Sequence, residues 1–175
     1  MRLRGRARVW YVSLLLPTTL RLLCGRWRRI ARCWPAARYI FLLRHPAAIL
    51  ASALASRRPD HGRDEVTDMV VEFLDAVRET LPVLTGITVR YEDLVSDPRA
   101  VMTRVCGYLG VPFEPGMIDY GRWDHGPLLS GVGDFGERIR SGRVLPASDG
   151  PAGGVPPRLR PALVEWGYVD AEVGS

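Results

Sequence analysis

The sequence contains no lysine, asparagine or glutamine, so all 24 of its basic side chains are arginines. Chemistry that needs a lysine amine is therefore excluded. Acidic residues are absent from residues 1–58, which hold thirteen arginines, whereas residues 59–175 hold eleven arginines and all nineteen acids. This asymmetry is typical of a surface that meets phosphate, nucleic acid or anionic lipid.

The sequence also contains only three cysteines, Cys24, Cys33 and Cys106, and no two of them form a CxxC motif. Neither a disulfide framework nor a zinc knuckle is indicated, so we expect no metal and a reducing, cytoplasmic location. The apolar run 9–16 is too short to span a membrane, which takes about 20 residues, and arginines follow it. Membrane association through the basic segment 1–33 is the alternative.

Length and composition predict one globular domain over residues 1–175, since 47% of the residues are hydrophobic and 25% are charged. Glycine, proline and aspartate are frequent after residue 111. Residues 146–157 are the richest part of this region, and we expect them to form a flexible loop.

The apolar run 39–43 predicts a strand buried on both faces of a parallel sheet. Arg44 follows at its carboxyl end, and Pro46 is suited to the first position of a helix. The expected buried stripe of this helix consists of Ile49, Leu50, Ala53 and Leu54. The order is therefore a strand, a turn and a helix.

Further strand and helix patterns follow along the chain. Residues 87–91 predict a second strand, and Asp97 can cap a helix that begins at Pro98 and is closed by Gly110. A last short helix is expected at 161–166. A separate helical face with apolar spacing comprises Val66, Met69, Val70, Phe73, Leu74 and Val77.

Strands that alternate with helices predict an α/β domain with a parallel sheet flanked by helices. Ligands of such folds bind beyond the carboxyl ends of the strands, where Arg44 and the pair Tyr91–Glu92 are expected. The Arg44 guanidinium, beside free backbone N–H groups of the helix start, suits a phosphate. Ser52, eight residues later, can add a neutral donor. Alternatively, Arg44 pairs with Glu92, and Ser52 only packs.

The segments Tyr39-Ile-Phe-Leu-Leu-Arg44-His-Pro46, Arg90-Tyr-Glu-Asp-Leu94 and Ser96-Asp-Pro98 resemble the PAPS-dependent sulfotransferases of bacteria in content, order and separation. The resemblance implies a P-loop-type sulfotransferase fold, here partial, with PAPS (3′-phosphoadenosine 5′-phosphosulfate) as co-substrate. It further implies that Arg44 and Ser52 hold the 3′-phosphate of PAPS. Intact relatives transfer the sulfate to a hydroxyl or an amine.

The chain departs from the family pattern at its start, because residues 1–38 contain no strand followed by a glycine-rich phosphosulfate loop. We therefore expect an N-terminally truncated or degenerate member that keeps the 3′-phosphate part of the site. No catalytic residue is assigned, since the three histidines, His45, His61 and His125, fit turn or surface positions. The acceptor is not identified by the sequence.

A different class of function also fits the charge pattern. A non-catalytic protein could use its arginine-rich N-terminal third to bind nucleic acid, an anionic membrane or a protein partner. Nucleic acid is disfavoured because no recognised nucleic-acid-binding module is present.

Overall fold

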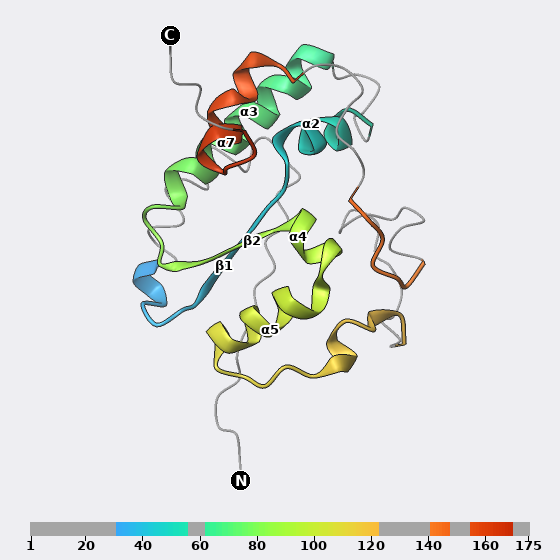
Figure 1. The fold of residues 1–175 in the computed structure, drawn as a ribbon. Coiled ribbons are helices and arrows are strands. Elements are labelled where there is room, and N and C mark those ends of the chain that lie inside the picture. Colours follow the sequence, from blue (N-terminus) through green and yellow to red (C-terminus); the bar gives the residue numbers. More distant parts are fainter. Residues whose placement is uncertain (1–30, 56–61, 123–140, 148–154, 170–175) are drawn as a thin grey trace.

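The computed structural model describes residues 31–55, 62–122, 141–147 and 155–169. Two parallel strands lie at the centre, and helices pack on both sides of them (Figure 1). The expected α/β class with a parallel sheet flanked by helices is confirmed. Of the basic segment 1–33, residues 31–33 are described and are helical; the remainder lies outside the described residues.

Strand β1 (Tyr39–Leu43) pairs in parallel with β2 (Gly86–Arg90), with Tyr39 opposite Gly86. Both strands were expected, although β2 ends one residue earlier because helix α4 (Tyr91–Ser96) begins there. The close approach of the strands requires glycine at 86. A Cβ atom there would lie 2.5 Å from the Tyr39 carbonyl oxygen.

The prediction that β1 is buried on both faces is wrong. Ile40 and Leu42 are 42% and 55% exposed, whereas Leu43 is buried. The helices of the described chain cover the Leu43 face of β1 but not the opposite face. On that opposite face, α5 (Pro98–Leu109) packs against β2 through Val89 instead.

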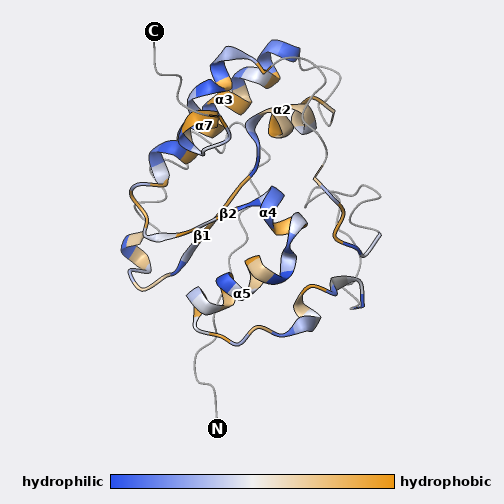
Figure 2. Ribbon diagram, in the orientation of Figure 1, coloured by the Kyte–Doolittle hydropathy of each residue, from blue (hydrophilic) through white to orange (hydrophobic). Residues whose placement is uncertain are grey.

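The larger core cluster lies on the Leu43 face and joins β1 to three helices. These are α2 (Pro46–Ala55), α3 (Arg63–Thr80) and α7 (Arg160–Glu165), which follows the short helix η3 (Pro157–Leu159). Apolar positions of α2, α3 and α7 gather where these helices meet (Figure 2). The cluster consists of Leu43, Leu50, Val70, Leu74, Leu159, Ala162 and Trp166.

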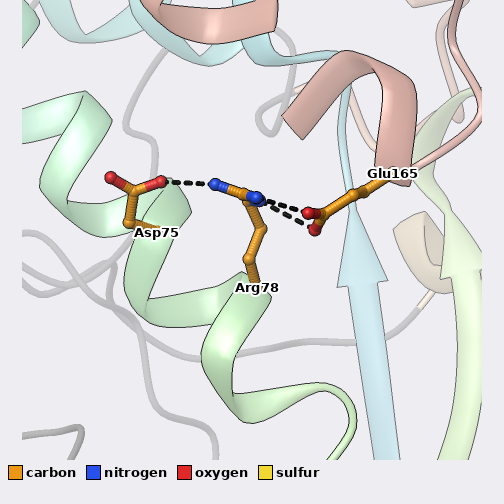
Figure 3. A network of polar contacts seen from close by, with 3 residues as sticks. All are labelled: Asp75, Arg78 and Glu165. Carbon is orange, nitrogen blue, oxygen red and sulfur yellow. Dashed lines mark hydrogen bonds and ion pairs between the residues drawn. The ribbon is translucent and has the colours of Figure 1, made fainter. Parts of the chain in front are cut away.

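The predicted stripe of α3 is confirmed as a core face, with one refinement. Val66, Val70 and Leu74 are buried, while Phe73 is only partly buried against the core cluster. Arg78 on the same helix bridges Asp75 and Glu165 and so joins α3 to α7 (Figure 3). The helix was therefore placed correctly by its apolar spacing, but its most buried side chain is Leu74.

The predicted boundaries of α5 are confirmed by its caps. The Asp97 side chain accepts a hydrogen bond of 3.0 Å from the Ala100 N–H, and Gly110 ends the helix at φ +71°. Two short 3-10 helices follow, η1 (Pro115–Met117) and η2 (Tyr120–Arg122). The predicted loop 146–157 is described only at its ends, of which residue 157 already begins η3.

Candidate functional site

The carboxyl ends of β1 and β2 meet, as the sequence predicted. Arg44 directly follows β1, and its guanidinium carbon lies 5.0 Å from the centre of the Tyr91 ring, which directly follows β2. Such a cation–π contact contributes about 0.5–1 kcal/mol at an exposed site and holds the arginine at the strand ends. The register of the two strands places Arg44 beside Tyr91, because Leu43 and Arg90, the residues before them, are paired.

The prediction of free N–H groups at the start of α2 is wrong. The His45 N–H donates to Glu92, and the Ala47 N–H donates to Nδ1 of His45 at 3.2 Å. The next two N–H groups, of Ala48 and Ile49, both donate to the His45 carbonyl. Pro46 has no N–H, so the donors available to an anion here are side chains.

Glu92 is occupied by groups other than a guanidinium. Its Oε1 accepts a bond of 2.9 Å from the His45 N–H, and its Oε2 accepts a bond of 2.7 Å from the Tyr168 hydroxyl. Burial alone would raise the pKa of the Glu92 carboxyl, but these hydrogen bonds together lower it below its usual value. Glu92 is therefore ionised at neutral pH and links the β1–α2 turn to the C-terminal segment.

Tyr168 completes this corner of the molecule, and sequence reasoning missed its role. Its ring meets the His45 ring edge-on at 4.9 Å between centroids, and the Arg90 guanidinium carbon lies 4.9 Å from its centre. Burial and the hydrogen bond to Glu92 raise the pKa of Tyr168 above its usual value, so the hydroxyl stays protonated and donates. The only sequence signal was the motif Trp166-Gly167-Tyr168.

Gly167 has a conformational reason to be glycine. Its φ is +68°, and a Cβ atom there would lie 2.6 Å from the Nη2 atom of Arg90. Arg90 reaches this point because Nη2 donates to the carbonyls of Trp166 and Gly167, at 2.6 and 3.0 Å. The end of β2 is thereby fastened to the residues that follow α7.

The two predicted phosphate ligands lie on consecutive elements. Arg44 is half-buried in the turn, and Ser52 is exposed on the second turn of α2, six residues after Pro46. Six residues of helix correspond to about 9 Å along its axis. Both residues also make other interactions in the structure. Their joint use for one phosphate stays a prediction.

One cavity of about 260 Å³ lies along the strands rather than at their ends. It is bordered by the sheet and by the ends of α3 and α7, and Arg44 does not line it. Its lining includes Phe41, Thr88, Arg90 and Trp166. Among the residues that the structure describes, no group of three histidine, cysteine or acidic side chains could hold a metal ion.

The arginine-rich N-terminal third, which carried the alternative function, falls mostly on residues outside the described ranges. His61 and His125 also fall there, as do the arginines at 138 and 140. In the described part of the chain, no helix is both long and apolar enough to cross a membrane.

Comparison with known proteins identifies the family. The family model described as the sulfotransferase family matches residues 18–115. Because this match covers more than half of the sequence, the protein belongs to the sulfotransferase family. A search of curated proteins found no match.

Two solved structures share the fold. One is the sulfotransferase domain from the curacin biosynthetic pathway, with a TM-score of 0.62 and 20% identity, covering 88% of this chain and 61% of that one. The other is the sulfotransferase domain from the Synechococcus PCC 7002 olefin synthase, with a TM-score of 0.59 and 25% identity, covering 77% and 50%. This chain therefore spans less than two thirds of either domain.

Proposed function

We propose that this chain binds the 3′-phosphate of PAPS, or of its product 3′-phosphoadenosine 5′-phosphate (PAP), through Arg44 and Ser52. The supporting observation is the position of Arg44 at the joint carboxyl ends of β1 and β2, fixed over the Tyr91 ring. A guanidinium there offers charge-assisted hydrogen bonds to phosphate, each worth about 1.5–3 kcal/mol. Ser52 supplies a neutral hydroxyl donor from the following helix.

The proposed role is to bind the nucleotide that donates the sulfate in sulfotransferase reactions. In intact relatives, the sulfate of bound PAPS passes to a hydroxyl or an amine of an acceptor. The residues of this chain that fit the nucleotide are side-chain donors, because Glu92, His45 and the His45 carbonyl already occupy the N–H groups at the start of α2. The phosphate affinity therefore depends on the Arg44 side chain more than on the helix terminus.

The test compares two nucleotides that differ by the 3′-phosphate. PAP should bind measurably in titration calorimetry, and 5′-AMP, which lacks the 3′-phosphate, should bind far more weakly. Arg44→Ala should reduce PAP binding to the 5′-AMP level. In melting curves, PAP at 100 times its dissociation constant for the wild type should add about 2.7 kcal/mol of stability to the wild type but not to Arg44→Ala.

Arg38→Ala is the matched control. Arg38 also lies near an aromatic ring, with its guanidinium carbon 5.9 Å from the centre of Tyr108, but at the opposite end of β1. The five residues of β1 lie between Arg38 and Arg44, a separation of about 20 Å. Arg38→Ala should keep the preference for PAP over 5′-AMP. Equal binding of PAP and 5′-AMP by the wild-type chain would refute the proposal.

A further inference from the structure

Three segments far apart in the sequence converge on one carboxylate at the strand ends. His45 belongs to the β1–α2 turn, Glu92 to the start of α4, and Tyr168 to the segment after α7. Glu92 accepts from the His45 N–H with one oxygen and from the Tyr168 hydroxyl with the other, at 2.9 and 2.7 Å. Both carboxylate oxygens therefore accept a hydrogen bond, one from the β1–α2 turn and the other from the segment after α7.

The bond from His45 acts directly on the residue before it. Arg44 and His45 share a peptide group, so holding the His45 N–H sets the plane of that peptide and the direction in which the Arg44 side chain leaves the backbone. The negatively charged carboxylate of Glu92 would repel a phosphate. Glu92 therefore acts through Arg44 and not by contact with the nucleotide.

Tyr168 in turn holds Glu92. Its ring is fixed by the edge-on contact with His45 and by Arg90, whose Nη2 donates to the Trp166 and Gly167 carbonyls. The Tyr168 hydroxyl therefore has a defined position from which to donate to Glu92. The orientation of the carboxylate, and through it of the turn, depends on residues that follow α7.

We propose that Glu92 is a positioning residue, held by Tyr168, that orients the Arg44–His45 turn for phosphate binding. This inference rests on the proposed function, because its effect is measured on the affinity for PAP. It makes the C-terminal residues 166–168 part of the nucleotide site without any contact to the nucleotide. It also predicts that the effects of changing Glu92 and Tyr168 on the affinity for PAP are not additive, because both side chains act through one chain of hydrogen bonds.

The experiment measures the dissociation constant of PAP for the full chain and a set of variants. Tyr168→Phe removes only the hydroxyl, and Glu92→Ala removes both acceptor oxygens. Each should weaken PAP binding about tenfold, a usual size for coupling between sites. The double variant should be no weaker than Glu92→Ala alone. Glu92→Gln should bind within about twofold of the wild type, because its amide can accept from His45 and donate to Tyr168.

Tyr108→Phe is the matched control, since Tyr108 also has an arginine near its ring but sits at the far end of β1 from the turn. It should leave PAP binding unchanged. Melting curves without ligand show that each variant is folded. Wild-type affinity in Tyr168→Phe, or equal losses in Glu92→Gln and Glu92→Ala, would overturn the inference.

Hydrogen exchange of the His45 amide separates this inference from the proposed function. The amide should exchange faster in Tyr168→Phe than in the wild type and in Tyr108→Phe, with no ligand present. If the wild type fails to bind PAP, the proposed function fails, and faster exchange in Tyr168→Phe still supports the link through Glu92. Unchanged exchange of the His45 amide would overturn that link, whatever the result with PAP.

Discussion

His45 caps α2 with its own ring, because Nδ1 accepts from the Ala47 N–H at 3.2 Å. Loss of an N-terminal cap costs about 1 kcal/mol, so His45→Ala should lower the free energy of unfolding by roughly that amount. His45→Asn offers a short acceptor at the same position and should recover most of this loss, although both variants lose the contact with Tyr168. Urea denaturation at neutral pH measures the difference. An asparagine variant as unstable as the alanine variant would contradict the capping role.

At the scale of residues, sequence reasoning succeeded where the contact is local. Asp97 caps α5 through an N–H three residues away, and such a bond depends only on the immediate sequence. The hydrogen bond from Tyr168 to Glu92 joins residues 76 positions apart. The sequence around Tyr168 does not indicate Glu92 as its partner, and the sequence around Glu92 does not indicate Tyr168. Arg44 and Glu92 were therefore predicted at the strand ends, but the hydrogen bond that Tyr168 donates to Glu92 was not.

At the scale of elements, α3 and α7 are joined by apolar packing and by the ion pair of Arg78 with Glu165 (Figure 3). Leu74 is 2% exposed, and Leu74→Ala should cost about 2–5 kcal/mol of unfolding free energy. The Glu165 side chain is 48% exposed, so Glu165→Gln should cost less than about 1 kcal/mol. Urea denaturation ranks the two variants. Comparable losses would contradict this ranking, because they would mean that the ion pair contributes as much as the core to joining these helices.

Physical reasons explain why helix α4 was not predicted and why the burial of β1 was predicted wrongly. Helix α4 is six residues long, which is too short for apolar periodicity to reveal it, and it is supported by its contacts with α5 and β2. The apolar run of β1 was taken as burial on both faces. Such a run shows only that both faces tolerate apolar side chains, and coverage depends on which helices pack there. In the described chain, α5 covers the Val89 side of β2 and leaves Leu42 exposed.

At the scale of the whole molecule, the two strands separate two apolar clusters, and their joint carboxyl ends carry the candidate site. The larger cluster includes Leu43, and the smaller one consists of Val89 packed with Val101 and Val105. The sequence predicted this arrangement because the order strand, helix, helix, strand permits a parallel pair whose carboxyl ends lie together. It could not predict that the chain after α7 returns to those ends, since that return depends on tertiary contacts of Arg90 and Tyr168.

We expect this chain to bind PAP without transferring sulfate detectably. Sulfuryl transfer needs donors that stabilise the charge developing on the bridging oxygen, and loss of a single such donor lowers a rate by about 10²–10³. The chain has no lysine to act there. Of the strands that the structure describes, β1 leads into Arg44-His45-Pro46 and β2 into Tyr91-Glu92, and neither turn is glycine-rich.

The measurement is transfer of radiolabelled sulfate from PAPS to a panel of phenols, sugars and amines, with PAP binding followed in parallel on the same preparation. Binding without transfer is the expected result, because the 3′-phosphate contacts hold the nucleotide by a part of the molecule that does not react. Transfer that disappears in Arg44→Ala but persists in Arg38→Ala would contradict the prediction. It would mean that side chains other than lysine stabilise the charge on the bridging oxygen, because the sequence contains no lysine.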